Sequence, residues 1–399
     1  QAGANLIETD TFGASPLRLK EFNFSKFDPS DLKAIPDQLD MKTCSLESLT
    51  LELNIEGCRI AKRAIEKYRA QPDYDGRPLF VAGSIGPSNY VVSSTEANLN
   101  KGTFGQIVEN FYHQVLGLVE GGADVLLIET QQDILETKAI IAGANKAFAE
   151  KKKKLPMIVQ ATVDVFSKMQ IFNTDIHAAY TAVSKMGIDV FGINCNVGPE
   201  EMLATVEKLS RFCKHPISVV PNAGQPISED GQTCYKLSPE DMANTMEPFV
   251  REYGVSIVGG CCGTTPAHIK ALREKLNGVV PVPRQPDKKV YVSGPQEAVP
   301  IDSSKGLLRI GERLNVRGSK LVRDAVEKED EEISMQVLEE VVNEQVKDLG
   351  IEIIDVCMDS NIVNTEETLS TIIHGLTSDF KGVMCIDSFS VEALEKAIE

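Results

Sequence analysis

The chain has 399 residues, of which 42% are hydrophobic, and a formal net charge of −17. A strongly acidic chain argues against nucleic-acid binding, which requires a basic face. No apolar run approaches the ~18–20 residues that span a bilayer, so no membrane segment is expected. Nine cysteines without the close regular spacing of a secreted disulfide framework indicate reduced thiols and a cytoplasmic location. We therefore expect a globular protein that acts on a small molecule.

The first two thirds of the chain alternate short apolar runs with amphipathic segments, which is typical of βα units around a parallel sheet. The runs are apolar throughout, as strands buried on both faces must be. Seven strands are predicted, at 4–13, 78–87, 124–130, 156–164, 189–199, 217–224 and 255–266. The helices predicted between them include 104–120, 131–150, 174–186, 199–213 and 238–252.

These units predict an α/β fold, a (β/α)8 TIM barrel over residues 1–278. The barrel is expected to lack its first strand, because the chain opens almost directly into the run "ANLIETD". Residues 279–307 are rich in proline and polar residues and predict a semi-extended interdomain linker. We expect 308–399 to be the start of a second (β/α)8 barrel, truncated at its C-terminal side. Its predicted elements are strands at 306–315, 350–360 and 382–390 and one long acidic helix at 324–348.

Three cysteines stand at the ends of two predicted strands. Cys195 ends the fifth run, in "FGINCNVG", and the adjacent Cys261 and Cys262 end the seventh, in "VSIVGGCCGTTP". Because the carboxyl ends of parallel barrel strands meet at one rim, the three sulfurs should converge there. Three thiolates with one open position describe a catalytic zinc site, whereas a structural zinc site takes four protein ligands. Isolated cysteines such as Cys58 and Cys213 are interpreted as small buried hydrophobes.

The segments "GINCNVGPE", "VVPNAGQP" and "GGCCGTTPAHI" resemble the homocysteine S-methyltransferase family, from residue 1 to about 278. The resemblance implies Zn²⁺ held by Cys195, Cys261 and Cys262, and homocysteine as the substrate whose thiol the zinc deprotonates. It implies that Glu129 receives the amino group of the substrate; the alternative is an acid at a helix N-terminus. Asn222 is a candidate fourth zinc ligand in the absence of substrate, or a simple turn residue.

The downstream segments "RIGERLNVRGSK", "IIDVCMDS" and "MCIDSFS" resemble the start of a pterin-binding domain of the dihydropteroate-synthase type. This order of domains is similar to the N-terminal half of the cobalamin-dependent methionine synthase family. Polar residues at strand ends are implied to bind the pterin, although helix capping is an alternative for each of them. They are Glu312, Asn315, Asp355, Asp387 and Ser388.

The resemblance implies methylcobalamin as the immediate methyl donor, on a cobalamin-binding domain that is absent from this chain, and 5-methyltetrahydrofolate as the methyl source. Two departures limit it: Cys357 stands where the pterin motif has asparagine, and the family's first-strand Asp-Gly motif is absent. The fragment is therefore not expected to complete the full reaction. One alternative is a folate-independent methyltransferase that uses betaine or S-methylmethionine. Another is a structural zinc module, which would need a fourth protein ligand.

Overall fold

The computed structural model describes residues 2–22, 45–93, 102–229, 231–302, 306–327, 334–377 and 379–398. Within these ranges the chain divides into two compact units. The first contains residues 2–93, 102–171 and 183–286, and the second contains residues 172–182 and 287–398. None of the described helices combines the length and the apolar character that a membrane crossing requires.

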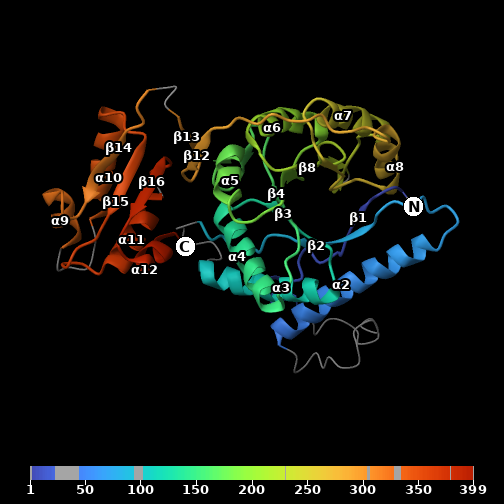
Figure 1. The fold of residues 1–399 in the computed structure, drawn as a ribbon, viewed down its shortest axis with the longest axis horizontal. Coiled ribbons are helices and arrows are strands. Elements are labelled where there is room, and N and C mark those ends of the chain that lie inside the picture. Colours follow the sequence, from blue (N-terminus) through green and yellow to red (C-terminus); the bar gives the residue numbers. More distant parts are fainter. Residues whose placement is uncertain are drawn as a thin grey trace. The chain divides into compact units, whose positions relative to one another are not determined.

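The first unit is built around a curled sheet of seven parallel strands, consistent with a TIM-like barrel (Figure 1). Each strand pairs with the next one along the chain, which is the topology of successive βα units. In order they are β1 (Leu6–Glu8), β2 (Phe80–Ile85), β3 (Val125–Gln131), β4 (Met157–Ala161), β7 (Val190–Asn194), β8 (Ile217–Val220) and β11 (Ile257–Val258). All seven predicted strands are confirmed. Among the described residues no eighth strand pairs with β1 or β11.

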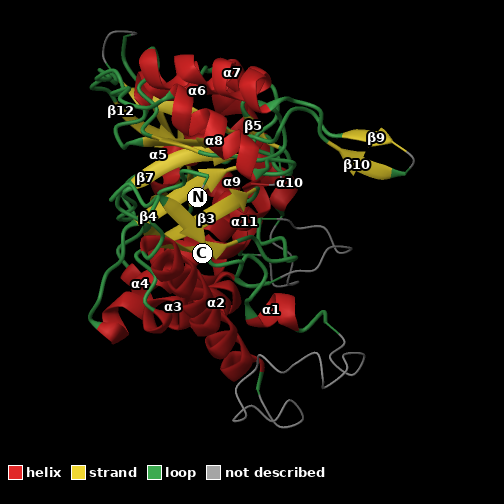
Figure 2. Cartoon of the chain, turned by 90° about the vertical axis from the view of Figure 1, so that its right-hand side faces the viewer, coloured by secondary structure: helices red, strands yellow, loops and turns green. Residues whose placement is uncertain are grey.

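Several helices of residues 2–286 begin at side-chain caps. Thr103 makes a capping box with Gln106, and Asp133 and Ser238 accept hydrogen bonds from the first turns of their helices. The helices are α1 (Pro16–Leu19), α2 (Leu46–Arg69), α3 (Phe104–Gly121), α4 (Ile134–Lys151), α5 (Ile176–Val183), α6 (Pro199–Phe212), α7 (Pro239–Arg251) and α8 (Pro266–Lys275). The shorter strands are β5 (Lys168–Met169), β6 (Thr174–Asp175), β9 (Ile227–Glu229) and β10 (Gln232–Cys234). β9 and β10 form an antiparallel hairpin that projects from the first unit (Figure 2).

The inner face of the sheet changes from apolar to polar along the strands. An apolar cluster contains Leu6, Ala82, Leu127 and Ile158, together with residues of the neighbouring strands. Because side chains alternate between the two faces of a strand, the residue two positions further along points the same way. At that next level the strands carry Glu8, Ser84, Glu129 and Gln160. The sequence therefore places polar side chains toward the carboxyl ends of the strands and apolar side chains nearer their amino ends.

Part of the predicted linker forms a β-hairpin, where a semi-extended chain was expected. Strands β12 (Val290–Ser293) and β13 (Ala298–Ile301) pair in antiparallel fashion on either side of a Gly-Pro turn. The Gln296 side chain donates a hydrogen bond to the Phe172 carbonyl (2.9 Å), and the Tyr291 ring packs edge-on against His177. The β-branched residues that flank the turn explain why this proline-rich segment forms strands.

The second unit also contains a parallel sheet of three strands, in the order β14 (Ile310–Asn315), β15 (Ile353–Cys357) and β16 (Val383–Asp387). The three strands predicted for this part are confirmed. The single helix predicted at 324–348 is wrong, because α9 (Lys320–Val326) ends early and α10 (Met335–Asn343) continues into a π-helical turn at Glu344–Asp348. Residues 328–333, between these two helices, lie outside the described ranges. Helices α11 (Thr365–Thr377) and α12 (Val391–Ile398) complete the unit.

Candidate metal and substrate site

The three predicted cysteines converge at the carboxyl ends of β7 and β11. The Cys195 sulfur lies 3.7 Å from that of Cys262, which lies 3.9 Å from that of Cys261. A tetrahedral zinc ion with Zn–S bonds of ~2.3 Å holds its sulfur ligands about 3.8 Å apart, so these spacings fit the ion. Among the described residues, no histidine, carboxylate or further cysteine joins the three in a metal-sized cluster. A structural zinc site with four such ligands is therefore not supported in the described part of the chain.

The end of β8 holds both cysteine-bearing loops. The backbone N–H of Cys195 donates to the Val220 carbonyl (3.0 Å), and that of Cys261 donates to the next carbonyl, Pro221 (2.8 Å). Cys195 and Asn196 both have positive φ angles, 61° and 66°, so the chain turns sharply after β7. These two contacts bring thiols that are far apart in the sequence to one rim.

Asn222 lies between the two loops and is only 2% exposed. Its side-chain oxygen accepts a hydrogen bond from the Cys262 backbone N–H (3.2 Å), and its side chain also hydrogen-bonds Cys195. Its backbone N–H donates to the Val197 carbonyl (3.0 Å). The residue therefore has a turn-stabilising role and also places an amide beside the sulfurs.

The pKa values of two of the thiols shift in opposite directions. A hydrogen bond from Cys261 is the main reason why the pKa of Cys195 falls to about 6. The same bond, together with burial, raises the pKa of Cys261. Negative charge on this rim is thus concentrated at Cys195, where it favours a bound cation.

Glu129 on β3 is a buried carboxylate near the sulfurs. Its exposed fraction is 8%, and it accepts hydrogen bonds from the Ser84 hydroxyl (2.6 Å) and from the Asn194 amide (3.5 Å). Burial, followed by the charge of Glu8, raises its pKa to about 7. The helix-capping alternative for Glu129 is wrong, because Asp133 caps α4. Glu129 is instead an acid that faces the barrel interior. Its hydrogen-bond partner Asn194, at the end of β7, directly precedes Cys195.

Glu8 on β1 was missed by the sequence analysis. It lines a cavity of about 350 Å³ together with Gln160 and Ser218, whose side chains are hydrogen-bonded to each other (2.8 Å). Loss of hydration inside the cavity, followed by the charge of Asp10, raises the pKa of Glu8, although its side chain remains accessible to solvent. The signal was present in "NLIETD", because Leu6 and Glu8 lie two positions apart and must share a face of the strand.

Comparison with known proteins identifies the family. The family model described as homocysteine S-methyltransferase matches residues 1–276. The chain belongs to the homocysteine S-methyltransferase family. It is 33% identical over 359 residues to methionine synthase of Mycobacterium tuberculosis and 30% identical over 404 aligned residues to methionine synthase of Mycobacterium leprae. These alignments cover 90% and 100% of this chain but only 27% and 30% of the two relatives.

Two solved structures share the fold. The metallated form of the homocysteine methyltransferase MmuM from Escherichia coli superposes with a TM-score of 0.51, and its oxidized form with 0.50. Each is 22% identical, over 69% of this chain and 80% of the other. At this identity the likeness concerns the fold.

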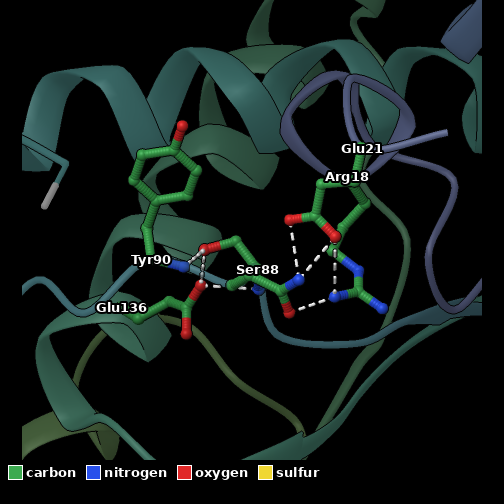
Figure 3. A network of polar contacts seen from close by, with 6 residues as sticks. Arg18, Glu21, Ser88, Tyr90 and Glu136 are labelled. Carbon is green, nitrogen blue, oxygen red and sulfur yellow. Dashed lines mark hydrogen bonds and ion pairs between the residues drawn. The ribbon is translucent and has the colours of Figure 1, made fainter. Parts of the chain in front are cut away.

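In this homocysteine S-methyltransferase family member, polar contacts fix the loop that follows β2 (Figure 3). The Ser88 backbone N–H and hydroxyl donate to one oxygen of Glu136 on α4, at 2.8 and 2.5 Å. The side chain of the next residue, Asn89, accepts a hydrogen bond from the Arg18 guanidinium and donates to the Glu21 carboxylate. The loops after β1 and β2 are thereby tied to the first turn of α4, on the rim that carries the sulfurs.

The predicted pterin-binding carboxylates lie on the sheet of the second unit. One face of this sheet packs against the helices in an apolar cluster, to which the strands contribute residues such as Leu314 and Val356. By strand alternation Asp355 faces the other way, and Glu312 and Asp387 are exposed. Burial raises the pKa of Asp355, which hydrogen-bonds Cys385 on the neighbouring strand.

Asn315 and Ser388 have local structural partners. The Asn315 side-chain oxygen accepts hydrogen bonds from the backbone N–H groups of Arg317 and Gly318, both at 2.9 Å. The Ser388 hydroxyl donates to the buried carboxylate of Asp359 (2.6 Å), a residue that the sequence analysis did not single out. Cys357 is buried and hydrogen-bonds Asp387 across the strands. The pterin-binding role of Asn315 and Ser388 stays a prediction.

The buried Glu136 makes the stability of the rim depend on pH. Burial raises its pKa from the ordinary 4.5 to about 8. A group whose pKa is raised by folding contributes stability that is fully present below pH 4.5 and is lost as the pH rises through about 8. We expect the thermal midpoint of the wild type, relative to that of Glu136→Gln, to fall as the pH is raised across this range.

Glu47→Gln is the matched control for this measurement. Glu47 is exposed in the first turn of α2, where a hydrogen bond from its own backbone N–H lowers its pKa. Because its pKa lies below 4.5, Glu47 is ionised over the upper part of this pH range, so the difference between Glu47→Gln and the wild type should be constant there. A constant difference for Glu136→Gln as well would contradict the prediction.

Proposed function

We propose that this chain binds homocysteine at the three-sulfur rim and presents its thiol for methylation, which forms methionine. The supporting observation is the spacing of 3.7 and 3.9 Å among sulfurs on two strand ends, beside the buried Glu129, in a member of this family. Zn²⁺ bound by the three cysteines would lower the pKa of a fourth, substrate thiol and make it a nucleophile at neutral pH.

Glu129 is the proposed partner of the substrate ammonium. A carboxylate in so buried a position is costly unless a positive charge or hydrogen bonds compensate for it. Ser84 and Asn194 supply hydrogen bonds and orient the carboxylate toward the barrel interior. Because Asn194 immediately precedes Cys195, the same strand end orients both the carboxylate and one sulfur, which fixes the spacing between the two groups that recognise homocysteine.

The methyl source is proposed from the second unit and from the relatives. We assign residues 1–278 to the homocysteine-binding zinc barrel, 279–307 to the linker and 308–399 to the start of a pterin-binding barrel. The division of the chain near residue 286 and the exposed carboxylates on the three-stranded sheet support this assignment. 5-Methyltetrahydrofolate would supply the methyl group, and methylcobalamin on a domain outside this chain would deliver it.

The metal content of the purified chain tests the sulfur site. We expect about one zinc ion per chain, and we expect Cys262→Ala to bind zinc much more weakly because only two protein ligands remain. Cys385→Ala, which removes a thiol outside the cluster, is the matched control and should retain zinc. Full zinc occupancy in Cys262→Ala, measured by elemental analysis after dialysis, would refute the assignment.

Substrate affinity tests Glu129. Replacing it with Gln keeps the shape of the side chain and removes the charge, so homocysteine binding should weaken by about 1–3 kcal/mol while zinc is retained. Titration calorimetry measures this. A homocysteine analogue without the amino group is the control ligand, and its affinity should be the same for both proteins. Equal homocysteine affinity of the two proteins would remove Glu129 from the substrate site.

Folate binding tests the second unit. A longer chain that completes the second barrel should bind methyltetrahydrofolate, and Asp387→Ala should weaken binding more than Asn315→Ala. The reason is that the exposed Asp387 carboxylate would accept hydrogen bonds from the pterin, whereas Asn315 already accepts two from its own turn. Pterin fluorescence follows the titration. An absence of saturable binding would favour betaine or S-methylmethionine as the donor.

A further inference from the structure

We propose that Thr130 is a positioning residue of the substrate site, which Asn194 holds in a left-handed backbone conformation so that the preceding Glu129 carboxylate points into the barrel. The proposal rests on the proposed function, in which Glu129 receives the substrate ammonium. It adds a residue that is neither a metal ligand nor the ammonium partner itself. Thr130 lies at the carboxyl end of β3, directly after Glu129.

The backbone of Thr130 has a conformation that its side chain disfavours. Its φ angle is 61°, in the left-handed region that β-branched residues rarely adopt. Such conformations persist only where the surrounding structure holds them, and they are concentrated at functional sites. The position therefore requires a local interaction that fixes it.

The pairing of β3 with β4 changes at the same point. The register shifts between Ile128 and Gln131, so that Glu129 and Thr130 together oppose a single residue of β4. This is the arrangement of a β-bulge, which redirects a side chain near the end of a strand. Beyond the bulge the two strands are joined again, because the Thr162 N–H donates to the Gln131 carbonyl (2.8 Å). The direction of Glu129 thus depends on the bulge as well as on the regular alternation of the strand.

The side chain of Asn194, at the end of β7, holds the bulge. Its oxygen accepts the Thr130 backbone N–H and its nitrogen donates to the Thr130 hydroxyl, both at 2.8 Å. A backbone N–H can only donate, so this contact decides which end of the amide faces it. The same nitrogen donates to the Glu129 carboxylate (3.5 Å). Asn194 is 0% exposed, and its own carbonyl accepts the Thr162 hydroxyl (3.0 Å), so the amide is itself fixed.

The Thr130 hydroxyl therefore contributes to the direction of the carboxylate. Without it, one hydrogen of the Asn194 amide loses its acceptor, and the bulge keeps only its backbone contact with that side chain. The Glu129 carboxylate would then turn more freely about its remaining bond from Ser84. The expected defect is confined to ligands that carry the amino group.

Thr130→Val tests this role in the zinc-loaded chain. Valine keeps the shape and the β-branch and removes the hydroxyl, so we expect homocysteine to bind about fivefold more weakly in titration calorimetry, the effect of one lost hydrogen bond. 4-Mercaptobutanoate, which is homocysteine without its amino group, should bind to both proteins equally. Thr130→Ser keeps the hydroxyl and should retain the wild-type affinity for homocysteine.

Three further variants make the outcome specific. Thr130→Gly adopts the left-handed conformation without strain and lacks the hydroxyl, so it should show the same loss even if the valine variant is unstable. In a Glu129→Gln background Thr130→Val should have no further effect, because it acts through that carboxylate. Thr181→Val is the matched control: its half-buried hydroxyl donates to the His177 carbonyl within α5 (2.8 Å), and its loss should leave homocysteine affinity unchanged.

Unchanged homocysteine affinity in Thr130→Val and Thr130→Gly, with Glu129→Gln impaired, would overturn the role of Thr130 alone. An equal loss for homocysteine and 4-mercaptobutanoate would show a general structural effect and would overturn it too. A wild type that binds homocysteine no more tightly than 4-mercaptobutanoate would overturn the substrate role of Glu129, and this proposal with it.

Discussion

The site depends on two successive carbonyl groups at the end of β8. Val220 and Pro221 accept the backbone N–H groups of Cys195 and Cys261, so one strand end fixes the loops on both of its sides. Asn222 continues the same strand and adds hydrogen bonds to the Cys262 backbone and to the Cys195 side chain. Hydrogen bonds of the main chain therefore set the spacing of the sulfurs, and a metal ion would meet ligands that are already close to their final separation.

The barrel interior explains why this rim can hold charged groups. An apolar layer that includes Leu127 and Ile158 lines the lower part of the sheet, and the next layer carries Glu129 and Gln160. The buried polar groups of this layer have hydrogen-bond partners, such as Ser84 for Glu129. Hydrogen bonds of this kind stabilise a carboxylate that is largely removed from water. The charge of a bound ammonium would then act at short range and with little screening.

The sequence predicted the parallel strands and the sulfur cluster because both follow from simple rules. Strands buried on both faces are apolar throughout, and residues at their carboxyl ends meet at one rim, which brings Cys195 to Cys262. The rules say less about residues whose role comes from tertiary contact. The capping of α4 by Asp133 rather than by Glu129 depends on where the helix begins. The π-helical turn likewise depends on packing, whereas the hairpin in the predicted linker follows from its β-branched residues.

The central claim is that three cysteines hold one zinc ion and leave a fourth position for the substrate sulfur. X-ray absorption at the zinc edge counts the sulfur neighbours of the metal directly. The account predicts three sulfurs, from Cys195, Cys261 and Cys262, in the zinc-loaded chain, and a fourth when homocysteine is added. A sulfur count that does not change on addition of homocysteine would contradict it.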